Sequence, residues 1–100
     1  FIGGNCGVYE GVLVKERAVL GSGVIINKST AVYDAVHGDY IRPDETGRIV
    51  IPAGAVVVAG SRPIRKGPGA EAGIHVYTPV IVKYRDGKTD ASVELEDLLR

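Results

Sequence analysis

The chain has 100 residues, 45% of them hydrophobic, and its formal net charge at pH 7 is zero. This length predicts one small domain with an apolar core, and the balanced charge argues against a general surface for nucleic acid or acidic membranes. The sequence contains no apolar run of about 18 residues, the length that would predict a membrane span, and it shows no signal-peptide pattern. The single cysteine, Cys6, cannot form an internal disulfide, so we expect a cytoplasmic protein in which Cys6 fills the core.

A period of six residues organises the first third of the sequence. Small or β-branched residues stand four positions after the first five large aliphatic residues, and this pairing predicts the hexapeptide repeat of a parallel β-helix. An antiparallel sheet with a period of two is the alternative, but it does not account for the small residues. The large residues are Ile2, Val8, Val14, Leu20, Ile26 and Val32, and the small ones are Cys6, Val12, Ala18, Val24 and Thr30.

Three hexapeptides make one triangular coil, so residues 18 positions apart should stack on one another. The sequence therefore predicts that Ile2 lies under Leu20, Val8 under Ile26 and Val14 under Val32, with all six buried in one prism. The repeat resumes at Ile51 and Val57, 13 residues later than the period requires. We expect the polar segment 33–48 to be an inserted loop or twisted hairpin that leaves the coil and returns to it, and such an excursion is more often functional than decorative.

The last 39 residues predict a different organisation. Residues 1–61 are expected to form the coils, and residues 62–100 a C-terminal part. Residues 62–69 are basic and rich in proline and glycine, which predicts a linker, and residues 73–84 are rich in β-branched residues, which predicts a strand. Asp90 is a suitable cap for a short terminal helix that reaches Arg100.

The sequence starts in repeat register and contains no methionine. The end coil of a solenoid exposes its apolar cross-section unless a cap covers it. We therefore interpret the chain as the C-terminal piece of a longer protein.

Glycines and basic residues mark the segments where an extended ligand would approach the backbone. Gly21 and Gly23 form one such segment, and Ala59 and Gly60 form the other. The basic cluster of Arg62, Arg65 and Lys66 that follows is suited to phosphates. Each signal is weak alone, because glycines are common at β-helix corners and charged linkers are usually solvated.

Other titratable residues give no specific signal by themselves. Glu10 reads as a surface carboxylate, and His37 and His75 read as structural or exposed residues. No spacing of histidine, cysteine and acidic residues resembles a metal site. No nucleophile and histidine can be paired from the sequence.

Nine motifs nevertheless occur in a recognisable order along nearly the whole chain. They are Phe1-Ile2-Gly3, Val8-Tyr9-Glu10-Gly11, Val14-Lys15-Glu16, Val19-Leu20-Gly21-Ser22-Gly23-Val24, Lys28-Ser29-Thr30, Ile51-Pro52-Ala53-Gly54, Val56-Val57-Val58-Ala59-Gly60-Ser61, Val80-Ile81-Val82-Lys83 and Glu96-Asp97-Leu98-Leu99-Arg100. Together they resemble the C-terminal part of the tetrahydrodipicolinate N-succinyltransferases.

The resemblance implies a left-handed β-helix, a homotrimer and a role in diaminopimelate and lysine biosynthesis. It implies transfer of a succinyl group from succinyl-CoA to the amino group of the ring-opened substrate, without a metal. Glu10 matches a glutamate of the family's active site, where a carboxylate accepts or directs the proton of the attacking amine; a covalent acyl role is the alternative. The implied CoA contacts are Gly21, Gly23, Ala59, Gly60 and Lys66.

Two features depart from the family pattern. The segments 33–48 and 64–73 are longer than in the family, and the substrate-binding arginine and aspartate of the family lie upstream of Phe1. The 100 residues alone are therefore expected to be inactive. Three alternatives remain: a related N-acetyltransferase that uses acetyl-CoA, a non-catalytic trimerising β-helix, and a metal-dependent β-helix enzyme of the carbonic anhydrase type.

Overall fold

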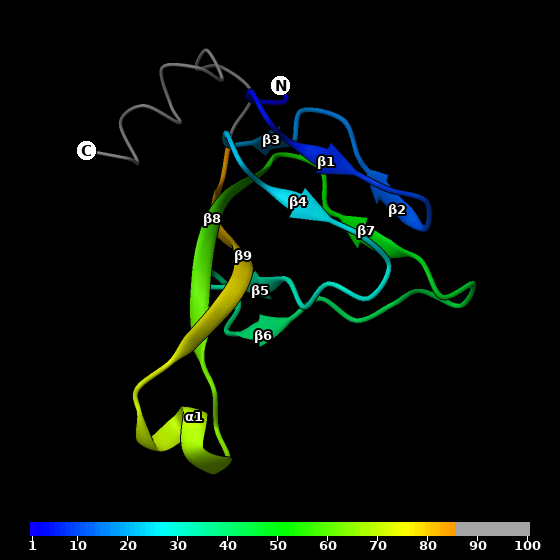
Figure 1. Cartoon of the computed structure of the whole chain (residues 1–100). Coiled ribbons are helices and arrows are strands. Elements are labelled where there is room, and N and C mark those ends of the chain that lie inside the picture. The colour runs from blue at the N-terminus through cyan, green and yellow to red at the C-terminus, as the bar shows by residue number, and fades with distance from the viewer. Residues whose placement is uncertain (86–100) are drawn as a thin grey trace.

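The computed structural model of the chain describes residues 1–85, whose regular secondary structure is nine β-strands and one five-residue helix. The all-β class expected from the sequence is confirmed (Figure 1). The turn expected at residues 86–87 and the helix expected from Asp90 lie outside the described residues. The elements are β1 (Gly7–Val8), β2 (Val12–Val14), β3 (Val19–Leu20), β4 (Ile25–Ile26), β5 (Tyr33–Asp34), β6 (Asp39–Tyr40), β7 (Ile49–Ile51), β8 (Ala55–Pro63), α1 (Gly67–Glu71) and β9 (His75–Tyr84).

The short strands at the start of the chain stack in parallel at the predicted spacing. Val8 of β1 pairs with Ile26 of β4, and Ile2 forms a parallel bridge with Leu20. Their corners also repeat, because the left-handed residues Asn5 (φ 58°) and Gly23 (φ 82°) are 18 positions apart. The predicted stacking is confirmed for both pairs.

The third predicted stack is wrong. Val14 pairs with Ile51 in the parallel pair β2–β7, not with Val32. The next pair, Leu20 with Val57 in β3–β8, has the same separation of 37 residues. The chain therefore leaves the regular stacking after Ile26, earlier than the sequence predicts.

Val32 keeps the repeat pattern although it stacks on no earlier strand. It is fully buried in the same core as Ile26 and Ile51, and its carbonyl accepts a hydrogen bond from the amide of Ile41 at 2.8 Å. A core position selects an aliphatic residue whether the chain reaches it along a coil or along an excursion. The period therefore reports the burial of Val32 and not its strand partner.

The inserted segment is a hairpin that joins a larger sheet. β5 and β6 pair antiparallel, and β5 pairs in parallel with β9, where Tyr33 lies opposite Val80. The resulting five-stranded sheet has the order β3-β8-β9-β5-β6. The excursion is thus held by main-chain hydrogen bonds to a strand about 47 residues later in the chain.

β8 and β9 form the longest hairpin of the structure, and α1 lies at its tip (Figure 1). The strand predicted at residues 73–84 is confirmed as β9. The linker predicted at residues 62–69 is wrong at both ends, because β8 continues to Pro63 and residues 67–71 form α1. The hairpin sets its pairing partners directly opposite one another, and this brings Gly60 against Thr78.

The core lies between the stacked short strands and the base of this hairpin. Leu20, Ile26, Ile51 and Val57 are completely buried, as the period predicts. Two predicted core residues are instead exposed, Ile2 by 57% and Val8 by 39%. Both lie in the first turn, which has a stacked neighbour on one side only within the described residues.

Candidate functional site

Glu10 lies two residues after the end of β1, exposed at the edge of a pocket of about 300 Å³. We call this the carboxylate pocket. Its walls come from the first turn, from the turn after β4 and from the loop that precedes β7. The lining residues are Glu10, Gly11, Lys28, Thr46, Gly47 and Arg48.

The glycine after Glu10 is required by both its backbone and its surroundings. Gly11 has a φ of 87°, a conformation that L-residues with side chains rarely adopt. A Cβ at Gly11 would lie 2.7 Å from the Cβ of Lys28. The aliphatic stem of Lys28 therefore passes over Gly11. This contact brings together two motifs of the family resemblance, the one that ends at Gly11 and the one that begins at Lys28.

The opposite wall is a loop ordered by Asp44. One carboxylate oxygen of Asp44 accepts hydrogen bonds from Thr46 and from the amide of Arg48, and the other lies 3.3 Å from the Nε of Arg48. The hydroxyl of Thr46 and the amide of Arg48 lower the pKa of Asp44 to about 2. Arg48 thus reaches the pocket with its charge partly neutralised by Asp44.

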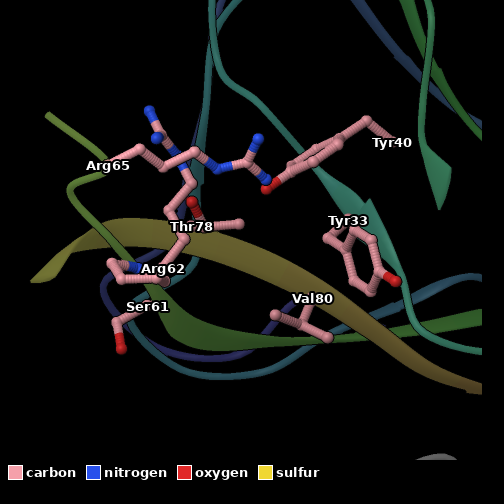
Figure 2. Close-up of a pocket in the computed structure, with 8 residues that line it drawn as sticks. Tyr33, Tyr40, Ser61, Arg62, Arg65, Thr78 and Val80 are labelled. Atoms are coloured by element: carbon pink, nitrogen blue, oxygen red, sulfur yellow. The ribbon is translucent and has the colours of Figure 1, made fainter. Parts of the chain in front are cut away.

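A second pocket of about 280 Å³ lies where the inserted hairpin meets the β8–β9 hairpin (Figure 2). We call it the arginine pocket. It combines two cationic side chains, two phenols and two aliphatic hydroxyls with apolar walls. The lining residues are Tyr33, Tyr40, Ser61, Arg62, Pro63, Arg65, Thr78 and Val80.

Two polar atoms in this wall have no hydrogen-bond partner among the described residues. They are the hydroxyl of Thr78, a residue only 1% exposed, and the Nε of Arg62. Buried polar atoms are nearly always hydrogen-bonded, so each of these two atoms lacks a partner that the described residues do not supply. Arg65 points from the hairpin toward Tyr40 on the other side of the pocket (Figure 2).

Gly60 connects the predicted ligand contacts to the arginine pocket. It lies opposite Thr78, and a Cβ there would be 2.7 Å from Cγ2 of Val80 and 2.9 Å from the carbonyl oxygen of Thr78. The close approach of β9 is therefore the physical reason for a glycine at position 60.

The other predicted CoA contacts lie along β3, β8 and the hairpin tip. Gly21 donates its amide to the carbonyl of Val57 at 2.8 Å, and Gly23 occupies an exposed corner two residues later. Ala59 is exposed on β8, and Lys66 is exposed at the start of α1. None of these residues lines the carboxylate pocket of this chain.

A buried carboxylate that the sequence did not single out joins the inserted hairpin to β9. Asp34, 4% exposed, accepts hydrogen bonds from the phenol of Tyr84 at 2.5 Å and from the amide of His37 at 3.1 Å. The oxygen that accepts from Tyr84, Oδ2, also lies 2.6 Å from Nδ1 of His37, and the amide of His37 bonds to Oδ1. Burial raises the pKa of Asp34, but the bonds from Tyr84 and His37 outweigh it and leave that pKa lowered.

Both histidines have a structural or exposed position, as the sequence predicted. The His37 side chain is 67% exposed and contacts Asp34. His75 is exposed, with its Nδ1 3.3 Å from the hydroxyl of Ser61. Tyr33, Tyr40 and Thr78 were missed, because a period-two strand pattern does not say which strands will become neighbours.

Within residues 1–85, no group of three or more histidine, cysteine or acidic side chains is arranged to hold a metal ion. No helix in this part of the chain has the length and apolar character of a membrane span.

Comparison with curated proteins gives matches over all 100 residues. The chain is 42% identical to a 2,3,4,5-tetrahydropyridine-2,6-dicarboxylate N-succinyltransferase of Bartonella quintana, over 33% of that protein. Proteins of the same name match at 41% identity in Cereibacter sphaeroides and at 43% in Burkholderia mallei, each over 32% of their length. The predicted resemblance is confirmed. The chain spans about a third of the length of these N-succinyltransferases, and no protein-family model matches it.

Proposed function

We propose that the chain is part of a cytoplasmic acyltransferase that moves a succinyl group from succinyl-CoA to the amino group of ring-opened tetrahydrodipicolinate, in lysine and diaminopimelate biosynthesis. The observation that supports it most is the alignment of the whole chain, at 41–43% identity, with N-succinyltransferases. The position of Glu10 at the edge of a polar pocket agrees with this reaction.

We further propose that the stacked strands form a left-handed parallel β-helix that assembles as a homotrimer. Parallel pairing at 18 residues in the first turns and repeated left-handed corners support the β-helix. In the trimer, the carboxylate pocket of one subunit would face CoA bound along its neighbour. This arrangement explains why Glu10 and the CoA contacts lie apart within one chain.

In the proposed reaction the amine nitrogen attacks the thioester carbonyl carbon. A new C–N bond forms, the C–S bond breaks, and the sulfur leaves as the thiol of CoA after taking up a proton. The attacking nitrogen must lose a proton as the amide forms, and Glu10 accepts or directs it. General-base catalysis of this kind contributes about 100- to 10,000-fold to a rate.

CoA is proposed to lie against Gly21, Gly23, Ala59 and Gly60, with its phosphates near the basic end of the hairpin. Lys66, Arg62 and Arg65 supply the cations there. The unpartnered hydroxyl of Thr78 adds a hydrogen-bond donor in the wall of the arginine pocket. Charge-assisted hydrogen bonds from guanidinium groups are well suited to phosphate.

The test is a donor assay on the full-length protein, with release of CoA thiol as the readout. We expect a kcat/KM for succinyl-CoA at least about tenfold above that for acetyl-CoA, a gap of the size that one pocket contact provides. A preference for acetyl-CoA would favour the N-acetyltransferase alternative. Absence of thiol release with either donor would favour the non-catalytic alternative, and loss of activity with a metal chelator would favour the metal-dependent one.

A further inference from the structure

The carboxylate pocket contains two cations as well as Glu10. Lys28 contributes from the turn after β4, with its stem over Gly11, and Arg48 contributes from the loop before β7. The chain places Lys28 beside the residue that follows Glu10. An ammonium and a carboxylate therefore border the same pocket of about 300 Å³.

The two cations differ in what already binds them. Arg48 is paired with Asp44 through its Nε at 3.3 Å. Among the part of the chain that the structure describes, Lys28 forms no ion pair. Lys28 is therefore the cation in this pocket that is available to a ligand carboxylate.

The proposed donor carries such a carboxylate. A succinyl group ends in a carboxylate about 4 Å from its thioester carbonyl carbon, as ordinary bond lengths require. An acetyl group has the same carbonyl and no carboxylate. A cation close to the general base can therefore contact the distal end of a succinyl group while its carbonyl is attacked.

We propose that Lys28 binds the free carboxylate of the donor's succinyl group and so selects succinyl-CoA over acyl donors that lack it. This inference rests on the proposed function, and it assigns a specificity-determining role to a residue outside the chemistry itself. Arg48, held by Asp44, shapes the opposite wall. The acceptor also carries carboxylates, and the experiment separates the two substrates.

The experiment uses the full-length protein and the substitutions Lys28→Ala and Lys28→Arg, with Lys15→Ala as the control. Lys15 is an exposed lysine that lines neither pocket. Calorimetry without acceptor measures the Kd of succinyl-CoA and of CoA. Donor assays then compare kcat/KM for succinyl-CoA and acetyl-CoA.

For Lys28→Ala we expect succinyl-CoA to bind about tenfold more weakly while the Kd of CoA is unchanged, and kcat/KM for succinyl-CoA to fall 10- to 100-fold. Lys28→Arg should restore part of the loss, and Lys15→Ala should behave as the wild type. An unchanged Kd of succinyl-CoA, an equal weakening of CoA, or a rise confined to the KM of the acceptor would each overturn the inference. A wild-type protein that uses neither donor would instead overturn the proposed function.

Discussion

The phenol of Tyr84 donates a 2.5 Å hydrogen bond to the carboxylate of Asp34, across a sequence separation of 50 residues. This bond fastens the inserted hairpin to β9, beside the parallel pair that Asp34 forms with Ile81. The buried carboxylate and its position within one sheet make the insertion part of the folded domain. Burial and the neighbouring Asp34 raise the pKa of Tyr84 to about 12, so the phenol remains a donor at all physiological pH values.

Removing this donor should destabilise the full-length protein. We expect Tyr84→Phe to lower the free energy of unfolding by about 2 kcal/mol, because a hydrogen bond to a buried charged group contributes about 1.5–3 kcal/mol. Tyr9→Phe is the matched control, since Tyr9 is 58% exposed. Urea unfolding followed by circular dichroism measures both, and equal stability of the two variants would contradict a structural role for the bond.

The same carboxylate should make stability depend on acid pH. Because the pKa of Asp34 is lowered from 3.8 in the folded protein, its stabilisation is present above about pH 4 and is lost as the pH falls through the lower folded value. Asp34→Asn should therefore be less stable than the wild type at pH 7, with a smaller difference at pH 3. Unfolding curves at the two pH values check this, and a difference that stays constant would exclude the charge as the cause.

Gly60 should tolerate no side chain. A Cβ there meets the carbonyl of Thr78 at 2.9 Å, and backbone cannot move away as a flexible side chain can. We expect Gly60→Ala to cost about 1–3 kcal/mol of stability, as overpacking usually does. Thermal unfolding measures this loss of stability. The control is Gly4→Ala, where a Cβ meets nothing within 4 Å, and it should have little effect in the same experiment.

Thr78 offers a test that separates binding from folding. Its hydroxyl has no partner among the described residues, so Thr78→Val should leave stability within about 1 kcal/mol of the wild type or raise it. The affinity for CoA should fall about fivefold or more if this hydroxyl binds the ligand. Thr30→Val, which removes the acceptor of the Asn27 amide at 2.9 Å, should instead cost stability. Calorimetry that shows unchanged CoA binding in Thr78→Val would remove Thr78 from the proposed site.

Glu10 should matter for rate and not for folding. In the full-length protein, Glu10→Gln is expected to lower kcat at least about 100-fold, the lower end of what a general base contributes. Its unfolding should change little, because the side chain is exposed. Steady-state kinetics and a melting curve on the same preparation check both parts, and a near-normal rate would leave Glu10 as a surface residue.

Four features could be read from the amino-acid sequence alone: the all-β class, the core positions from Leu20 to Val57, the first two stacked pairs and the resemblance to the N-succinyltransferases. These are local or periodic properties. A six-residue period records which side chains are buried, and short motifs such as Tyr9-Glu10-Gly11 are readable without knowing their neighbours. Gly11 shows how a motif residue reflects the fold, because its left-handed φ and the nearby stem of Lys28 both require a residue without a side chain.

The place where the chain returns after it leaves the coil is visible only in the folded structure. Val14 pairs with Ile51 and not with Val32, because the length of an excursion does not alter the period on either side of it. The same folding brought Tyr33 and Thr78 into one pocket and Tyr84 onto Asp34. Such contacts join segments some 45–50 residues apart, and they arise from strand pairing and burial of the assembled sheet, for which no local pattern in the sequence provides a signal.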